Sequence, residues 1–143
     1  MCILYLGGSL MNEQQSQANR KVLVCITLQQ NSKRLIDEGS SLAQSLNADF
    51  HILHISKGTT IFENEESSKL FQELFRYGAS LGGEVHFLCS MHVTDTITSF
   101  IKENAITDLV IGAAPNNNEE KKNVYNRLTE SLQMINIITL KRE

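Results

Sequence analysis

Residues 106–115, Ile-Thr-Asp-Leu-Val-Ile-Gly-Ala-Ala-Pro, form the pattern in this chain that is most typical of a ligand site. The apolar run ends at Gly112, and a strand that ends in glycine brings backbone close to whatever binds at the carboxyl edge of a parallel sheet. Backbone N–H groups of a glycine-rich loop commonly hold phosphate at such an edge. Residues 116–123 contain no glycine, however, and Pro115 has no N–H to donate. The pattern therefore predicts a ligand crevice without a conventional phosphate loop.

Short apolar runs alternate along the chain with segments that repeat at helical spacing, and this alternation predicts the elements around the crevice. The runs that predict strands are 22–26, 50–55, 85–89, 108–112 and 135–140. The helical segments are one capped by Asn31 or Ser32, one after the acidic residues 63–66, one capped by Thr94 and ending near Asn104, and one that carries Leu128. Continuous apolar strands separated by helices favour parallel pairing with right-handed crossovers. We therefore expect an α/β fold with an open five-stranded parallel sheet and helices on both faces.

The length of 143 residues and the absence of a Pro-rich or Ser-rich linker predict a single domain over residues 21–143. Residues 1–20 end in a polar, Gln-rich stretch, which predicts a flexible N-terminal arm. The hydrophobic run before Gly7 is too short to cross a bilayer. This run also lacks the basic segment with which a signal peptide begins. We therefore expect no membrane insertion.

Net charge and cysteine content indicate which kinds of partner and which cellular compartment to expect. Thirteen Lys and Arg residues stand against sixteen Asp and Glu residues, a net charge of −3, which disfavours nucleic acid as a partner. Three cysteines, an odd number without Cys-x-x-Cys spacing, favour a reducing, cytoplasmic location.

The histidines do not predict a metal site or a catalytic set. His51 and His54 lie three residues apart on one expected strand, so their side chains point to opposite faces of the sheet. No helical His pair or carboxylate cluster completes a ligand set around either residue. We therefore expect no metal ligands and no catalytic residues.

Three stretches together resemble the universal stress protein (UspA-like) superfamily. They are Val-Leu-Val-Cys-Ile-Thr at 22–27, Leu-Ala-Gln-Ser-Leu-Asn-Ala-Asp-Phe-His-Ile-Leu-His at 42–54, and Ile-Thr-Asp-Leu-Val-Ile-Gly at 106–112. The resemblance covers roughly residues 21–140 and is closest to the domain of this kind in KdpD-type potassium-sensing histidine kinases. It implies the adenine nucleotide alpha hydrolase-like fold, with strand order 3-2-1-4-5, and a role in stress response or signalling.

The resemblance also implies where a nucleotide would bind. Nucleotide-binding members hold adenosine with an Asp after the first strand, and phosphates with a G-x-x-G-x9-G-S/T loop after the fourth. The Asp position falls here on Thr27, and the next polar position falls on Gln29. Gly112 keeps the first loop glycine, Pro115 stands at the second, and the closing Gly-Ser region falls near residues 125–127. The implied site for ATP or AMP is therefore degenerate.

Cyclic di-AMP is a second ligand that the resemblance implies. Some KdpD domains bind it through an S-x-S element and, about twenty residues later, an F-T-A-x-Y element. Residues 27–29 and 50–54 keep the register of these two elements. Phe50 is identical to its counterpart, and His54 replaces the tyrosine with a ring that can stack or form a hydrogen bond.

Each candidate residue also has a structural interpretation. Residues 27–32 can be a strand end followed by a helix cap, and Phe50 can belong to the core. Arg127 can contact a ligand phosphate or pair with Glu130 three residues later on the same helix. The candidate ligand-binding residues are Thr27, Gln29, Asn31, Ser32, Phe50, His54, Gly112, Ala114, Asn126 and Arg127.

We therefore expect a non-enzymatic sensory domain that binds an adenine nucleotide or cyclic di-AMP between residues 27–32 and 112–127. Bound ligand would stabilise one loop arrangement, which a signalling partner protein would read. The alternative is a ligand-free interaction module that forms a homodimer through residues 135–140. A third alternative, a slow nucleotide hydrolase, needs a base, a metal-ligand set or an intact phosphate loop, and the sequence reveals none of these.

Overall fold

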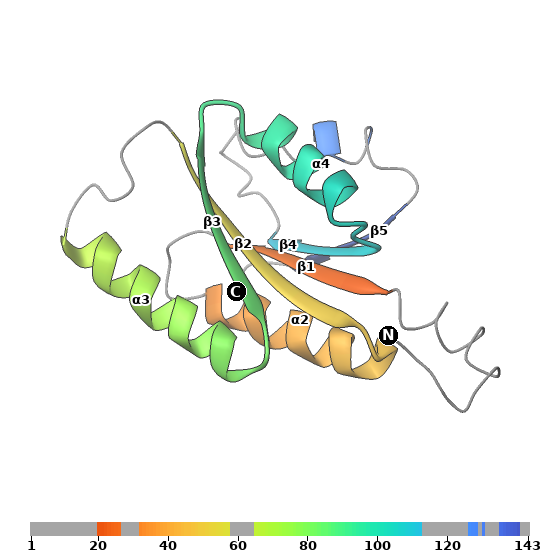
Figure 1. The fold of residues 1–143 in the computed structure, drawn as a ribbon, viewed down its shortest axis with the longest axis horizontal. Coiled ribbons are helices and arrows are strands. Elements are labelled where there is room, and N and C mark those ends of the chain that lie inside the picture. The colour runs from red at the N-terminus through yellow and green to blue at the C-terminus, as the bar shows by residue number, and fades with distance from the viewer. Residues whose placement is uncertain are drawn as a thin grey trace.

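The structure is a computed structural model that describes residues 20–26, 32–57, 65–112, 126–128, 130 and 135–140 (Figure 1). Its elements are β1 (Lys21–Ile26), α2 (Ser32–Leu46), β2 (Asp49–Lys57), α3 (Glu65–Ser80), β3 (Glu84–Ser90), α4 (Val93–Glu103), β4 (Asp108–Gly112) and β5 (Asn136–Leu140). Residues 126–128 and 130 are also helical. The alternation of strands and helices that the sequence predicts is confirmed in these ranges.

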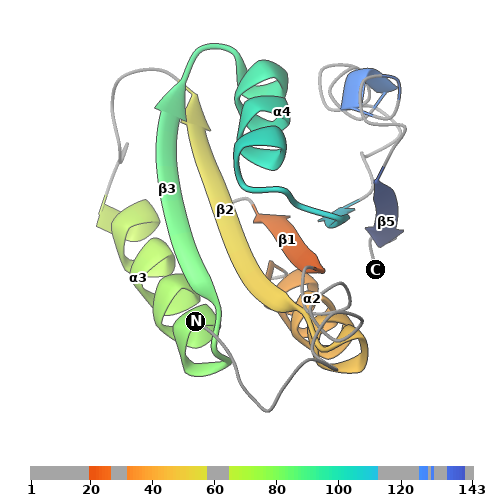
Figure 2. The same ribbon diagram turned by 45° about the vertical axis from the view of Figure 1, so that its right-hand side comes forward.

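The five strands form one parallel sheet in the order β3-β2-β1-β4-β5, which confirms the expected order 3-2-1-4-5. β1 is the central strand, and its Val22 pairs with Phe50 of β2 and with Asp108 of β4. Figure 2 shows β3 at one edge of the sheet and β5 at the other. In Figure 1, α2 and α3 lie below the sheet and α4 lies above it, so helices cover both faces as expected.

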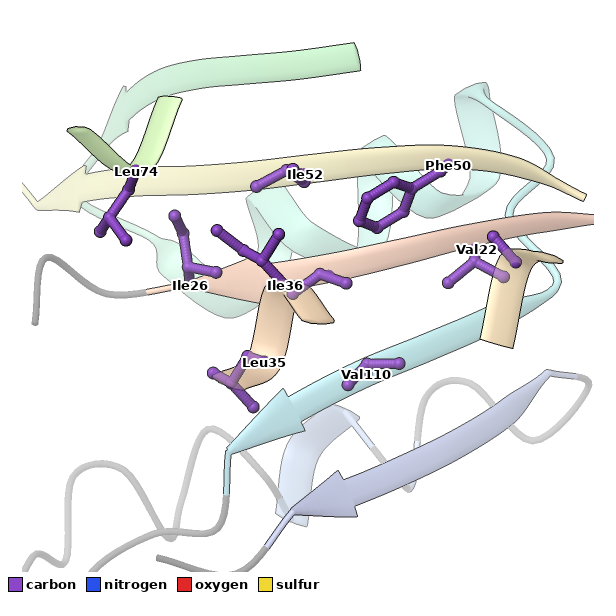
Figure 3. Close-up of a cluster of buried hydrophobic side chains, with 10 residues drawn as sticks. Val22, Ile26, Leu35, Ile36, Phe50, Ile52, Leu74 and Val110 are labelled. Carbon is purple, nitrogen blue, oxygen red and sulfur yellow. The ribbon is translucent and has the colours of Figure 1, made fainter. Parts of the chain in front are cut away.

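β1 contributes to two separate cores because its side chains alternate between the two faces of the sheet. Val22, Val24 and Ile26 meet α2, α3 and the neighbouring strands on one face (Figure 3). Leu23 meets α4 and the buried Leu128 on the other face. The side chains from Val22 to Val24 are 0% exposed. A strand buried on both faces must be apolar at every position, which explains its continuous hydrophobic run.

α2 lies very close to the sheet at Gly39. A Cβ built on Gly39 would collide with Cγ2 of Val24 and would lie 2.9 Å from Cε1 of Phe50. A glycine in a helix interior costs about 1 kcal/mol of helix propensity relative to alanine. Here its missing side chain lets the helix backbone pack directly on β1 and β2.

The expected capping of α4 by Thr94 is wrong. The N-cap residue is His92, which makes no side-chain capping hydrogen bond, and Thr94 lies buried inside the first turn. Ser90 at the end of β3 instead accepts hydrogen bonds from the His92 N–H at 2.9 Å and from Thr96 Oγ1 at 2.7 Å. The expected end of the helix near Asn104 is confirmed, since Asn104 is its C-cap.

A buried carboxylate joins three segments at the amino edge of the sheet. The Asp108 side chain on β4 accepts hydrogen bonds from Nε and Nη2 of Arg20 at 3.1–3.3 Å. It also accepts from Nδ2 of Asn136 on β5 at 3.1 Å and from Oγ1 of Thr107 at 2.6 Å. Asp108 is only 2% exposed, and these donors compensate the cost of burying its charge. Arg20 is thus anchored, whereas residues 1–19 of the expected N-terminal arm lie outside the described residues.

A helix that spans a bilayer needs about 20 predominantly apolar residues. Within the described residues, no helix is long and apolar enough to cross a bilayer.

We predict that Gly39→Ala lowers the free energy of unfolding by about 1–3 kcal/mol, because the added methyl group forces α2 away from β1. Gly112→Ala is the matched control. Among the described residues, a Cβ on Gly112 meets only Cδ1 and Cδ2 of Leu35, at 3.6 and 3.9 Å, so we expect a change below about 1 kcal/mol. Urea denaturation of both variants measures the two values. Equal stability of the two variants would contradict the close approach of α2.

We predict that Asp108→Ala lowers the free energy of unfolding by about 2 kcal/mol, because Arg20, Thr107 and Asn136 lose a charged acceptor. The matched control is Asp95→Ala, which removes an exposed carboxylate that also pairs with an arginine. We expect that loss to stay below about 1 kcal/mol. Urea denaturation compares the variants, and a loss at Asp108 no larger than at Asp95 would contradict a structural role for the buried carboxylate.

Candidate functional site

The topology places a candidate site at the carboxyl ends of β1 and β4. Open α/β sheets bind ligands outside the carboxyl ends of their strands, at the point where successive connections leave in opposite directions. In this sheet that point lies between β1, which is followed by β2 on one side, and β4, which is followed by β5 on the other. The described residues at this edge include Ile26 at the end of β1, Gly112 at the end of β4 and Ser32 at the start of α2.

Gly112 is exposed, and the described structure does not itself require a glycine there. A Cβ on Gly112 would make only ordinary contacts with Leu35 of α2. The φ angle of Gly112 is not positive either, unlike that of Gly82, so backbone conformation does not demand glycine. Among the described residues, only Leu35 of α2 lies near the space that a Cβ of Gly112 would occupy.

Ser32 is the first residue of α2 and is buried at this same edge. The first turn of a helix has backbone N–H groups without intrahelical partners, and such groups favour an anion. The structure thus brings Ser32 and Gly112 to the same edge of the sheet, as the sequence predicts.

His54 lies beside the end of β1, with which it pairs in register. Its Nδ1 atom is 2.9 Å from the carbonyl oxygen of Ile26. A carbonyl only accepts hydrogen bonds, so Nδ1 carries the proton and Nε2 of the neutral ring is an acceptor. Burial lowers the pKa of His54, while the hydrogen bond to Ile26 opposes this shift. The ring also packs against Phe87, with the centroids 5.2 Å apart.

Asn126 and Arg127 are exposed on the short helical stretch 126–128, which Leu128 anchors in the core. Nη2 of Arg127 lies 3.6 Å from Oδ1 of Asp95 in the first turn of α4. The side chains are 62% and 72% exposed, so solvent screens this pair and it contributes little stability. The ion-pair partner seen in the structure is thus on another helix, whereas the sequence suggested Glu130 on the same one.

Phe50 is not brought to this site. It lies in the core near the amino end of β2, beside Val22 and against Gly39 (Figure 3). Gly112 ends β4, which is separated from β2 by β1, and it lies at the carboxyl edge of the sheet. Of the two interpretations of Phe50 that the sequence allows, the structure supports the core residue.

Four candidate residues, Thr27, Gln29, Asn31 and Ala114, lie outside the described residues. Their proposed contacts with a ligand therefore stay predictions.

The amino end of β2 carries a cluster of two histidines and one glutamate that the sequence did not predict. Nδ1 of His51 lies 3.2 Å from Nε2 of His86 and 3.2 Å from Oε2 of Glu84. Periodicity relates only histidines on the same strand, so from the sequence no further histidine or carboxylate is expected beside His51, and the structure corrects this expectation. The missing information was the register of the parallel pair, which sets His51 opposite Glu84 and Leu53 opposite His86. Burial lowers the pKa of His51, while the charge of Glu84 acts in the opposite direction.

We predict that His54 makes stability depend on pH. Its pKa in the folded state lies below the ordinary value of 6.5, so below about pH 6.5 the unfolded chain takes up the proton more readily. The free energy of unfolding should therefore fall as the pH drops from 7 to 5, and His54→Gln should make this fall shallower. His92→Gln, at an exposed histidine, should leave it unchanged. Urea denaturation at each pH tests this, and an identical slope in all three proteins would refute the role of His54.

Comparison with known proteins supports the fold. No protein-family model matches the chain, and no curated protein does. A universal stress protein from Archaeoglobus fulgidus superposes with a TM-score of 0.66 at 17% identity, covering 90% of this chain and 98% of that one. A universal stress protein in complex with cAMP gives 0.64 at 14% identity, covering 88% and 99%.

A third structure, the universal stress protein from Archaeoglobus fulgidus in complex with dAMP, gives a TM-score of 0.59 at 16% identity and covers 87% of this chain and 98% of that one. At such low identity these likenesses establish architecture alone. The chain has the fold of the universal stress proteins.

Proposed function

We propose that this chain is a non-enzymatic sensory domain that binds an adenosine monophosphate at the carboxyl edge of its sheet, between β1 and β4. The observation that carries the proposal is the exposed Gly112 at the end of β4. Because neither the packing of the described residues nor a positive φ calls for glycine there, we explain the absence of a side chain by the close approach of a ligand.

Two observations support an adenosine monophosphate as the ligand: the ligands of proteins with the same fold, and the loop sequence of this chain. Two universal stress proteins of the same fold were solved with cAMP and with dAMP, each of which carries one adenine and one phosphate group. This chain lacks the loop glycines that would bring backbone N–H groups to a triphosphate, and Pro115 removes one such donor. A single phosphate needs fewer of these donors.

The described residues suggest how such a ligand would be held. The amino terminus of α2 carries the partial positive charge of a helix start and so favours the phosphate, and Nε2 of His54 can accept a hydrogen bond from an amino or hydroxyl group. Arg127 can turn from Asp95 to the phosphate at little cost, because its present ion pair is exposed and weak. We assign the protein to the cytoplasm and its output to a signalling partner, as in the KdpD-type domains that the sequence resembles.

A second candidate function is a dimerising interaction module, and the position of β5 favours it. β5 is an edge strand whose residues 137–140 are half-buried. Such an edge offers unpaired backbone groups to a second copy of the chain. In that case the crevice would be vestigial and the homodimer would form without nucleotide.

We predict that AMP, cAMP or dAMP raises the thermal midpoint of unfolding in a concentration-dependent way, because a ligand held only by the native state stabilises that state. Gly112→Ala should fold normally but bind at least about tenfold more weakly, since its Cβ occupies the approach to the backbone. Gln72→Ala, at an exposed position of α3, is the control and should bind like the parent.

Thermal unfolding with AMP, cAMP, dAMP, ATP and cyclic di-AMP distinguishes the alternatives. A shift with cyclic di-AMP alone would replace the mononucleotide with the KdpD-type ligand. No shift with any of the five, together with a dimer in light scattering, would favour the interaction module. Phosphate release from ATP by the purified protein would contradict the non-enzymatic assignment.

A further inference from the structure

Three side chains that commonly bind metals meet where β2 and β3 pair near their amino ends. Nδ1 of His51 lies 3.2 Å from Nε2 of His86 and 3.2 Å from Oε2 of Glu84, and these last two atoms are 3.8 Å apart. All three come from the start of two adjacent strands whose register is set by the sheet. The cluster therefore lies at the opposite edge of the sheet from the nucleotide crevice and is independent of it.

The distances match the edges of a metal coordination tetrahedron. Zinc binds histidine nitrogen and carboxylate oxygen at about 2.0–2.1 Å, so neighbouring ligand atoms of a regular tetrahedron lie about 3.3 Å apart. Two of the three separations in the cluster are 3.2 Å. The third, between His86 and Glu84, is longer and involves the exposed carboxylate, which can rotate.

Hydrogen bonding alone satisfies this cluster poorly. Nδ1 of His51 faces one nitrogen and one oxygen at the same distance, and a single N–H cannot point at both. A cation among the three atoms would accept a lone pair from each of them. The other nitrogen of His51, Nε2, is buried without a hydrogen-bond partner among the described residues. This holds with or without a bound cation, so Nε2 favours neither the metal-free nor the metal-bound cluster.

The surroundings hold the rings and leave one side open. The His86 ring packs edge-on against Phe100 of α4, with the centroids 4.8 Å apart. The side chains of His51 and His86 are 10% and 23% exposed, whereas that of Glu84 is 68% exposed. The exposed Glu84 carboxylate therefore leaves the cluster accessible from solvent.

We propose that His51, Glu84 and His86 bind one divalent transition-metal ion of the zinc class, with water at the fourth position. Two imidazoles and one carboxylate suit zinc, whereas magnesium and calcium prefer sites made entirely of oxygen atoms. The bound ion links the edge strand β3 to β2 and so stabilises the folded state.

The proposal is tested by adding ZnCl₂ to the metal-free 143-residue chain and measuring affinity by calorimetry and stability by thermal unfolding. We expect one ion per chain and a midpoint that rises with zinc concentration but not with MgCl₂. Glu84→Gln, at an exposed side chain, and His86→Gln should each weaken zinc binding by at least about tenfold. His92→Gln, at an exposed histidine outside the cluster, is the matched control and should bind zinc like the parent.

The experiment must distinguish zinc binding at this site from zinc binding by a cysteine, because Cys89 is an exposed thiol near the far end of β3. Co²⁺ substitution distinguishes the two, since thiolate ligands give an intense charge-transfer band that imidazole and carboxylate ligands do not give. We expect no such band, and we expect Cys89→Ser to bind zinc like the parent. A thiolate band, unchanged affinity in Glu84→Gln and His86→Gln, or no zinc binding by the parent would each overturn the proposal.

Discussion

The burial of β1 on both faces is the constraint on which the rest of this structure depends. Its three central side chains are completely covered, so layers must pack above and below the strand, and a neighbour must pair on each side. α2 and α3 cover one face of the sheet, and α4 together with Leu128 covers the other. The reversal of strand order beside β1 follows from this arrangement and creates the candidate site.

The two edges of the sheet have different physical characters. At the amino edge, Asp108 and its donors neutralise a buried charge and tie the entry of β1 to β4 and β5. At the carboxyl edge, Gly112 is exposed, and the amino terminus of α2 carries the partial positive charge of a helix start. The residues that stabilise the fold through Asp108 and the residues of the candidate ligand site thus lie at opposite ends of the strands. A substitution at one edge is therefore expected to act largely independently of the other.

Much of the fold was predictable because its signals are local. The run 108–112 is apolar after its first residue and ends at a glycine, and β4 has the predicted bounds. The start of α4 shows where local signals fail, because Thr94 is a good capping residue that packing buries inside the helix. Phe50 was open to two interpretations because its sequence position does not reveal the proximity of Gly39.

By itself, the sequence determined the order of the elements, the α/β class and the place of Gly112 at the end of a strand, because periodicity and glycine act over a few residues. Only the tertiary structure decided which distant side chains meet. His51 meets Glu84 and His86 from the next strand, and Arg127 meets Asp95 from another helix. Such contacts depend on strand register and helix placement, which the packing of the whole sheet sets and no short stretch of sequence encodes.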